Sequence, residues 1–274
     1  MESKIKYGKT ASAGKKTSGS CADMNRETML DNPDEIRVAI RGFYAQRALS
    51  NISCCGDGQA NQLYPADMLS TLSEDTSSFS LGCGDPITVA RLETGETVLD
   101  LGSGGGLDCF LAAKQVGTGG YVIGVDMTSE MLERACTAAE EMGITNVEFR
   151  QGYLEDLPVK NGSIDVVISN CVINLSPDKP KVFAEIFRVL KPGGRISISD
   201  IVTTRELPPE IKYDLAAWGA CISGALHMEE YTGGLTSAGF TDIKLTPRDG
   251  AGLRHNKIPQ GILFSVSILA LKPE

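Results

Sequence analysis

The stretch "VLDLGSGGG" at residues 98–106 decides which fold the sequence supports. Its first half is apolar, as a buried strand is, and its glycines lead into a helix predicted over "LDCFLAAKQV", residues 107–116. A strand that ends in glycines before a helix lets a ligand approach bare backbone at the helix N-terminus. The nicotinamide fingerprint G-x-G-x-x-G fails here, because the sixth position counted from Gly102 is Leu107. The stretch therefore predicts a ligand-binding turn of a different kind.

Strand and helix patterns alternate from residue 97 onward. Strands are predicted at 121–126, 147–151, 165–169 and 195–200, and helices at 128–143 and 179–190, with the turn "KPGG" stopping the latter. Residues 201–228 interrupt the alternation, and a helix at 228–239 and strands at 241–247 and 263–272 close the domain. This order predicts an α/β fold with a doubly wound, Rossmann-like parallel sheet. The interruption is expected to be an insertion that covers the substrate.

The residues before this core have a different character. Residues 1–24 are predicted to be a disordered tail, because they have scattered lysines and no apolar segment. Residues 31–50 predict an amphipathic helix, with Asn32 as N-cap and Pro33 at its first position. Residues 51–86 are loop-rich, with one short helix predicted at 64–72. We predict a single domain over 25–274, divided into an N-terminal cap (25–90), a ligand-binding core (91–200), and the insertion with the closing strands (201–274).

Composition excludes several classes of function. The chain has 274 residues, of which 42% are hydrophobic and 22% charged, as in ordinary globular proteins. Its net charge of −9 argues against a nucleic-acid partner. No apolar run approaches the ~20 residues that span a bilayer, and the opening stretch is typical of neither a secretory signal nor a transit peptide. We therefore expect no membrane association and a cytoplasmic location.

The glycine turn is one of several motifs that share a resemblance. "VLDLGSGGG" resembles motif I of the class I S-adenosylmethionine-dependent methyltransferases, and "GYLEDLP" and "LKPGGRI" resemble further motifs of that family. In such proteins an acid after the second strand, here Asp126, accepts both ribose hydroxyls. The cofactor is positively charged, which suits an acidic pocket. The resemblance implies S-adenosylmethionine as cofactor, bound by Asp100, Gly102, Ser103, Gly104, Asp126, Met127, Leu154, Glu155 and Asn170.

A purely structural interpretation of the same residues is also possible. Gly102 and Gly104 could form a tight turn alone, and Asp126 could be a helix-capping acid. Asp100 either accepts a hydrogen bond from the amino group of the ligand or only orders the loop. The sequence leaves these alternatives open.

Three of the eight cysteines differ from the rest. Cys83 lies in "GCG", Cys171 follows Asn170 directly after the buried strand "IDVVIS", and Cys221 lies in the insertion, in "WGACISGAL". Ligands of open α/β sheets bind just outside the carboxyl ends of the strands, so three separate segments could bring thiols to one mouth. The spacing alone does not distinguish a site shared by the three cysteines from three cysteines that only pack in the core.

The remaining cysteines and the histidines carry less information. Cys21 lies in the tail, and Cys109 and Cys136 lie in predicted helices, where cysteine packs as a small hydrophobe. The spacing is not that of a disulfide scaffold. No C-x-x-C pair occurs, and His227 and His255 are distant in sequence, so a structural zinc site is not predicted.

The segments around the three cysteines have a more specific resemblance. "SLGCGDP", "GETVLDLGSGGGLDCFLAA", "SNCVINLSPDK" and "WGACISGAL" resemble arsenite methyltransferases over roughly residues 33–248. The resemblance implies that Cys83, Cys171 and Cys221 bind trivalent arsenic. It also implies that a fourth cysteine, either Cys54 or Cys55, forms a redox pair with Cys83. The substrates would be arsenite and methylarsenite, and thioredoxin or glutathione would be the thiol reductant. Unlike longer relatives, the sequence ends soon after its last predicted strand.

This resemblance accounts for a cysteine at a position where a general base might be expected. Trivalent arsenic is soft, so thiolates are its natural ligands. Its lone pair would attack the sulfonium methyl group in line without a deprotonating base, and the protein would supply proximity and orientation.

Two rival functions fit the sequence less well. One is a methyltransferase for an organic acceptor, whose cysteines only pack. The other is a metalloid-binding protein without turnover, which would have no need of the glycine turn and Asp126.

Overall fold

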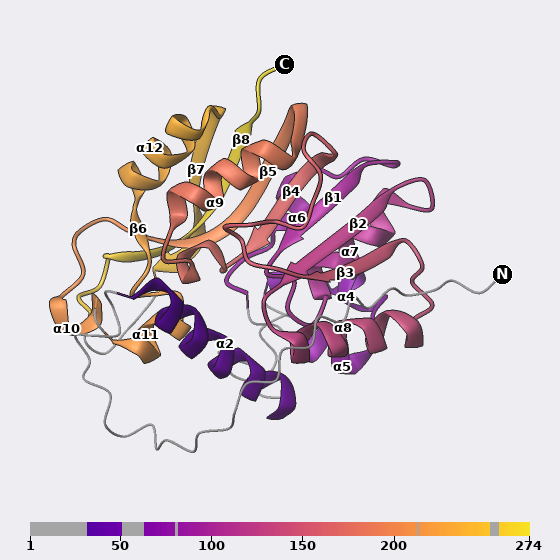
Figure 1. Ribbon diagram of the computed structural model, residues 1–274, viewed down its shortest axis with the longest axis horizontal. Coiled ribbons are helices and arrows are strands. Elements are labelled where there is room, and N and C mark those ends of the chain that lie inside the picture. Colours follow the sequence, from indigo (N-terminus) through magenta and orange to yellow (C-terminus); the bar gives the residue numbers. More distant parts are fainter. Residues whose placement is uncertain (1–31, 51–62, 80–81, 213, 253–257) are drawn as a thin grey trace.

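The computed structural model describes residues 32–50, 63–79, 82–212, 214–252 and 258–274. Within them, an eight-stranded sheet has the order β3-β2-β1-β4-β5-β8-β7, and β6 pairs with β5 (Figure 1). The strands are β1 (Thr97–Leu101), β2 (Tyr121–Asp126), β3 (Val147–Gln151), β4 (Ile164–Asn170), β5 (Leu190–Thr203), β6 (Leu226–His227), β7 (Thr241–Gly252) and β8 (Leu263–Leu271). Strands β1 to β5 are parallel, whereas β8 runs antiparallel to β5 and β7. The predicted doubly wound sheet is confirmed, with an antiparallel closing pair.

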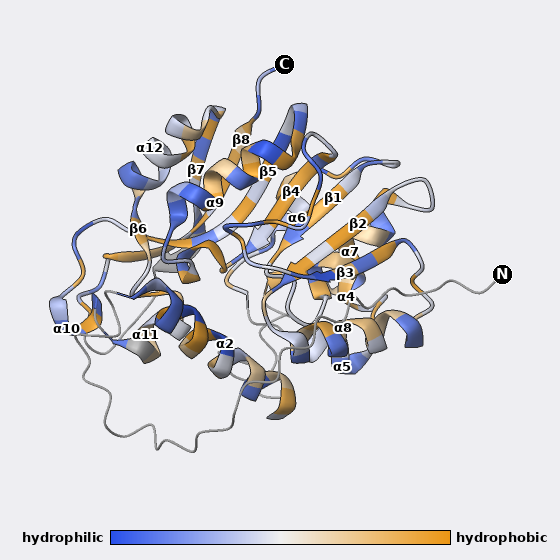
Figure 2. Cartoon of the chain, in the orientation of Figure 1, coloured by the Kyte–Doolittle hydropathy of each residue, from blue (hydrophilic) through white to orange (hydrophobic). Residues whose placement is uncertain are grey.

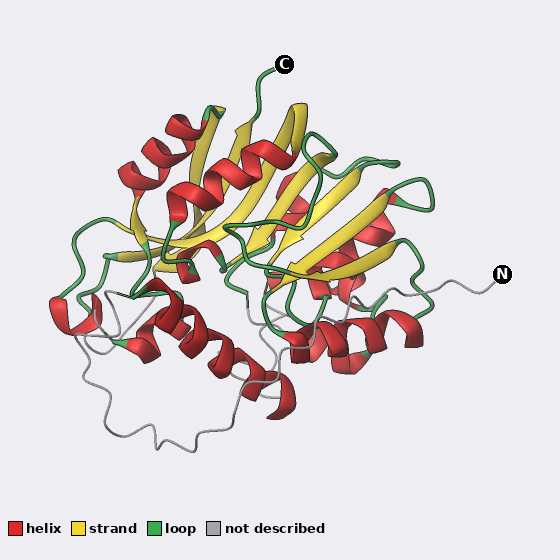
Figure 3. Cartoon of the chain, viewed as in Figure 1, coloured by secondary structure: helices red, strands yellow, loops and turns green. Residues whose placement is uncertain are grey.

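Helices cover both faces of this sheet (Figure 3). Those described are α2 (Pro33–Ser50), α4 (Ala66–Leu69), α5 (Glu74–Ser78), α6 (Pro86–Ala90), α7 (Leu107–Val116), α8 (Ser129–Glu141), α9 (Lys179–Val189), α10 (Pro209–Lys212), α11 (Leu215–Gly219) and α12 (Met228–Ala238), with a 3-10 helix, η1 (Ile173–Leu175). The helix predicted at 107–116 agrees with α7 at both ends. Asn32 caps the following helix as expected, because its Oδ1 accepts from the backbone N–H of Asp34 at 3.0 Å.

The sheet divides the core into two layers. Leu99 and Leu101 of β1 face the layer that contains Phe183 of α9 and Tyr231 of α12. Val98 points to the opposite layer, with α6 and α7. Because both faces are covered, the central strands are largely apolar, as the orange stretches in Figure 2 show. This double burial explains why apolar residues face both sides of these strands.

A third cluster lies beyond the carboxyl ends of the strands. It joins Ile36 and Ile40 of α2 to Ile211 of α10, and it includes Cys171 and Cys221. Figure 1 shows α2, α10 and α11 together below this edge of the sheet. Residues 201–228, predicted to be an insertion, contain α10, α11 and β6. The cap and the insertion therefore meet at the edge where a ligand is expected.

Two local expectations need correction. Helices α5 and α6 were not predicted, although each has a capping side chain: Ser73 Oγ accepts from the N–H of Thr76 at 3.3 Å, and Asp85 Oδ1 accepts from the N–H of Thr88 at 2.9 Å. The turn "KPGG" does not separate helix from strand. Helix α9 ends at Val189, β5 begins at Leu190, and the turn is absorbed where the pairing with β4 shifts register.

Residues 1–24, predicted to form a tail, lie outside the described residues. In the part of the chain that the structure covers, every helix is too short or too polar to cross a bilayer.

Candidate functional site

A cavity that is open to solvent lies at the carboxyl end of β1. The glycine turn forms part of its wall. Gly102 has a φ of 67° and its N–H donates to Val125 O at 2.8 Å. A Cβ atom at this position would overlap the side chain of Val172. Glycine is therefore required at 102 by both conformation and space.

The predicted cofactor residues gather at this cavity with one exception. Its wall includes Gly102, Ser103, Gly104, Asp126, Met127, Leu154, Glu155 and Asn170. Asp100 is not among the residues that line it. The Asp100 side chain is buried, and its Oδ2 accepts from the Cys109 thiol at 3.2 Å. Burial raises the pKa of Asp100 well above its ordinary value. In the structure Asp100 therefore contacts helix α7 and does not line the cavity.

Asp126 contacts both the glycine turn and the segment that precedes α8. Its Oδ2 accepts from the N–H of Gly104 at 2.9 Å, and its Oδ1 accepts from the N–H of Thr128 at 2.8 Å. Burial raises the pKa of Asp126, while these backbone hydrogen bonds act in the opposite direction. The carboxylate therefore ties the glycine turn to the start of α8 and also faces the cavity.

Sequence reasoning missed a contact across the cavity. Arg37 of α2 lines the cavity, and its Nη2 donates to Glu155 Oε1 at 3.1 Å. The same Oε1 accepts from Ser176 Oγ at 2.6 Å. Tyr44 of α2 also lines the cavity. The helical periodicity of α2 indicated which side is apolar, but nothing local could identify Glu155 as the partner of Arg37.

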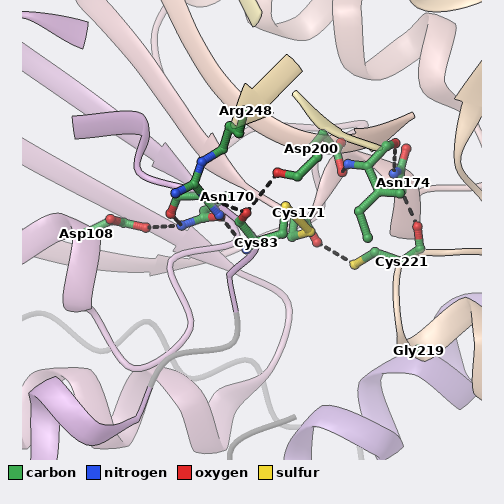
Figure 4. Close-up of a disulfide and its surroundings, with 12 residues drawn as sticks. Cys83, Asp108, Asn170, Cys171, Asn174, Asp200, Gly219, Cys221 and Arg248 are labelled. Carbon is green, nitrogen blue, oxygen red and sulfur yellow. Dashed lines mark hydrogen bonds between the residues drawn. A yellow bond between two sulfur atoms is a disulfide. The ribbon is translucent and has the colours of Figure 1, made fainter. Parts of the chain in front are cut away.

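The three singled-out cysteines come together beside this cavity (Figure 4). Cys83 and Cys171 form a disulfide, with Cα atoms 5.8 Å apart, and the Cys221 thiol donates to the carbonyl oxygen of Cys171 at 2.6 Å. Cys171 itself lines the cavity. Three segments separated by 88 and 50 residues therefore converge on one point.

Both Cys171 and Cys221 have left-handed backbones, with φ angles of 62° and 60°. This conformation is uncommon for residues other than glycine and, when it occurs, is concentrated at functional sites. At Cys171 it is held by a hydrogen bond from its N–H to Ser199 O at 2.8 Å. The backbone is thus fixed in unusual turns at two of the three cysteines.

The other cysteine predictions have mixed outcomes. Cys54 and Cys55, one of which was expected to pair with Cys83, lie outside the described residues, as does Cys21. In the structure Cys83 forms a disulfide with Cys171. Cys109 is buried in α7 and Cys136 is partly buried in α8. Among the described residues, no group of three or more His, Cys, Asp or Glu side chains could hold a metal ion.

Two buried ionisable residues near Cys221 were not predicted, Asp200 and Lys179. Asp200 is fully buried, and burial raises its pKa to about 7. Burial also lowers the pKa of Lys179 to about 8, and its Nζ donates to Ser176 O at 2.9 Å. Both residues lie within segments predicted as strand and helix, where the sequence pattern gives no sign of a polar contact.

Known proteins resemble this chain in sequence and in fold. A family model described as "Methyltransferase domain" matches residues 92–239. The crystal structure of an arsenic(III) S-adenosylmethionine methyltransferase from Chlamydomonas reinhardtii has 35% sequence identity, covers 76% of this chain and 73% of its own, and superposes with a TM-score of 0.67. The chain belongs to the arsenic(III) S-adenosylmethionine methyltransferase family.

Curated family members extend this likeness. The chain is 42% identical over 246 residues to an arsenite methyltransferase of Halobacterium salinarum and 36% identical over 242 residues to one of Homo sapiens. These alignments cover 82% and 83% of this chain, but 63% and 64% of the relatives. The chain therefore spans less than two thirds of the length of these arsenic(III) methyltransferases.

Proposed function

We propose that the protein transfers the methyl group of S-adenosylmethionine to trivalent arsenic held by cysteine thiolates. The observation that carries this proposal is the position of Cys171, which lines the cavity and also lies against Cys83 and Cys221. Family membership supports the same conclusion. Arsenite and methylarsenite are the proposed substrates.

The cavity suits a positively charged cofactor. The carboxyl groups of Asp108, Asp126 and Glu155 line it, and the glycine turn presents backbone next to the start of α7. Within this wall, Gly102, Ser103, Gly104 and Asp126 would hold the nucleoside part, with Met127, Leu154, Glu155 and Asn170 around it. S-adenosylmethionine, when bound, supplies an electrophilic methyl group on a sulfonium. The acidic lining would favour this cation over a neutral analogue.

The thiols suit arsenic and need no general base. Arsenous acid exchanges its hydroxyls for sulfur, because arsenic is soft and thiolates are soft ligands. Three thiolates leave the lone pair of arsenic available as nucleophile, so the protein contributes proximity and orientation. With Cys83 and Cys171 joined as a disulfide, Cys221 is the one thiol of the three that can bind. Reduction of the disulfide must therefore precede binding by all three.

The disulfide also fits the electron balance of the reaction. Methyl transfer oxidises arsenic formally from As(III) to As(V), and two thiols that form one disulfide return the two electrons. We propose that Cys83 and Cys171 take part in this step and that Cys54 or Cys55 joins the relay with Cys83. An external dithiol or thiol, thioredoxin or glutathione, would then restore the thiols by exchange. Such a cycle requires a reducing compartment, and on this ground we propose a cytoplasmic location.

The test is a single incubation followed by analysis of both products. The purified chain, reduced with dithiothreitol, is incubated with arsenite and S-adenosylmethionine, and methylated arsenic and S-adenosylhomocysteine are quantified. One S-adenosylhomocysteine is expected for each methyl group transferred to arsenic. Arsenite binding without S-adenosylhomocysteine would instead indicate a binding protein, and full turnover by a Cys171→Ser variant would indicate an organic acceptor. Cys136→Ser is the matched control, because Cys136 is a thiol of α8 away from the site.

A further inference from the structure

Two asparagines flank Cys171 in the segment "NCVIN", residues 170–174. We propose that Asn170 and Asn174 are positioning residues, each of which holds one distant cysteine segment against the Cys171 turn. Asn170 holds the segment of Cys83, and Asn174 holds the segment of Cys221. The inference rests on the proposed arsenic chemistry, because it assigns to each asparagine the placement of one sulfur ligand.

Asn170 forms hydrogen bonds with the backbone of Cys83 and of the next residue, Gly84. Its Oδ1 accepts from the N–H groups of Cys83 at 2.9 Å and Gly84 at 3.1 Å, and its Nδ2 donates to Gly84 O at 2.8 Å. A Cβ atom at Gly82 would overlap the Asn170 amide. The absence of a side chain at Gly82 therefore allows the backbone next to Cys83 to lie directly on this amide.

The Asn170 amide is itself fixed from the opposite side. Its Nδ2 lies 2.9 Å from Tyr64 Oη and 3.2 Å from Asp108 Oδ2, and the Tyr64 hydroxyl donates to Asp108 Oδ1 at 2.5 Å. Tyr64 and Asp108 are both buried. Because its amide contacts both the Cys83 segment and this buried pair, Asn170 cannot turn without breaking several hydrogen bonds. Asn170 thus connects the Cys83 segment to Asp108, which lies in the cavity wall.

Side chains from two strands hold the other face of the Cys83 backbone. Arg248 Nη1 and Ser265 Oγ each donate to Cys83 O at 2.8 Å. These bonds would persist if Asn170 were removed, and the covering strands β7 and β8 would remain. The loss of Asn170 should therefore loosen the Cys83 segment without releasing it.

Asn174 makes the corresponding contact with Cys221. The Asn174 side chain is fully buried in η1, and its Nδ2 donates to Cys221 O at 3.3 Å and to Ile201 O at 2.7 Å. Its backbone is equally confined, because a Cβ atom at Gly224 would overlap Asn174 O. Asn174 therefore fixes the carbonyl of a cysteine whose backbone is already in a left-handed turn.

The two asparagines hold different cysteines, so replacing each of them should change a different measurement. The first is the equilibrium constant for reduction of the Cys83–Cys171 disulfide by dithiothreitol. The reduced fraction is measured by alkylation of the thiols and intact-mass analysis. Asn170→Ala should make this disulfide about tenfold easier to reduce, a shift of about 30 mV. Asn174→Ala should leave it unchanged. This measurement involves neither arsenic nor cofactor, so it remains informative if the proposed function fails.

The second measurement is binding of phenylarsine oxide, a trivalent arsenical with two exchangeable positions, to the reduced protein. Trp218, the single tryptophan of the chain and three residues before Cys221, reports binding by fluorescence. Asn174→Ala should weaken binding about tenfold, because it frees the Cys221 segment. Asn170→Ala should keep it within twofold of the unchanged protein, because Cys171 and Cys221 suffice for this ligand.

Asn146→Ala is the matched control. Asn146 Nδ2 also donates to two carbonyl oxygens, Ala113 O and Gly117 O, both at 2.9 Å, but these lie at the far end of α7. Its loss should leave both measurements unchanged. A second approach to Asn170 is Gly82→Ala, which displaces the Asn170 amide without altering it and should ease disulfide reduction in the same direction. Gly42→Ala, where a Cβ meets no atom within 4 Å, is its control.

Two outcomes would overturn the proposal. The first is a folded Asn170→Ala or Gly82→Ala protein with the original disulfide equilibrium. The second is an equal change in both measurements for Asn170→Ala and Asn174→Ala, which would indicate general loosening of the turn.

Discussion

Arg37 and Glu155 lie 118 residues apart and join helix α2 to the loop after β3 across the candidate cofactor cavity, with Arg37 Nη2 donating to Glu155 Oε1 at 3.1 Å. Both residues line the cavity. A ligand held in the cavity would therefore have α2 along one side, and the ion pair would resist its departure.

The first prediction concerns this contact. Arg37→Ala should raise the dissociation rate of S-adenosylmethionine about fivefold, because a partly exposed ion pair contributes up to about 1 kcal/mol. Stopped-flow displacement of the cofactor measures this rate. Arg41→Ala, on the exposed side of the same helix, is the control and should leave the rate unchanged. An unchanged rate in the Arg37 variant would remove the pair from cofactor retention.

Replacement of Asp126 by alanine should weaken cofactor binding by tenfold or more. Hydrogen bonds to charged groups contribute about 1.5–3 kcal/mol, and this carboxylate also holds Gly104 at 2.9 Å. Calorimetric titration gives the affinity. Asp165→Ala is a suitable control, because Asp165 Oδ2 also accepts from a backbone N–H, that of Thr97 at 2.9 Å, at the amino end of the sheet. Equal affinity for both variants would exclude the ribose role.

Cofactor affinity should also depend on pH through Asp108. Burial raises the pKa of Asp108 to about 6. Below pH 6 its carboxyl group is neutral, and above pH 6 it is an anion in the cavity wall, so affinity for the cationic cofactor should increase severalfold between pH 5 and pH 7.5. Asp108→Asn should flatten this profile. A profile that keeps its slope in the variant would assign the effect to another group.

The sign of the corresponding effect on stability is opposite. Because the folded pKa of Asp108 lies above its ordinary value of 3.8, folding favours the protonated form. That contribution is full below pH 3.8 and is lost as the pH rises through 6. In the absence of cofactor, the melting temperature of Asp108→Asn minus that of the unchanged protein should therefore increase as the pH rises from 5 to 7.

Serine at Cys171 or at Cys221 should abolish methylation of both arsenite and methylarsenite. A hydroxyl is a hard, weak ligand for arsenic, and either substrate would lose one of its two inner thiolates. Rates with each substrate, measured beside Cys136→Ser, test this. Normal turnover of both substrates by either variant would contradict a shared thiol site.

Removal of Cys54 and Cys55 together should distinguish the two substrates. These residues lie outside the described part of the chain, so the expectation rests on the family resemblance. Methylarsenite has only two exchangeable positions, which Cys171 and Cys221 can fill, so its methylation should persist while that of arsenite slows or stops. Equal losses for both substrates would assign these thiols to folding or access.

The fold was predictable where information is local. The apolar strands, the glycine turn after β1 and the ends of α7 follow from patterns a few residues long. The same holds for Asn32 as a cap and for the insertion after β5. The short helices α5 and α6 were not predicted, because their capping residues lie in a stretch dominated by loop-forming residues.

Several residues of the site could be predicted from the sequence, but the contacts between them could not. The sequence places Cys83, Cys171 and Cys221 in three segments, but their meeting point depends on how irregular loops pack against one another. The disulfide between Cys83 and Cys171, the Arg37–Glu155 pair and the hydrogen bonds from Asn170 to the Cys83 segment are all contacts between residues more than 85 positions apart. Such contacts leave no periodic signal in the chain.

The left-handed turns at Cys171 and Cys221 limit how this thiol site could be transplanted. Idealised scaffolds for protein design avoid positive φ at residues other than glycine, whereas here φ is 62° and 60° at two of the three cysteines. Cysteines placed on regular helix faces or strand faces would point their sulfurs along different directions from those found here. A designer who wished to graft an arsenic receptor from this protein would have to carry over the turns themselves, together with the side chains that hold them.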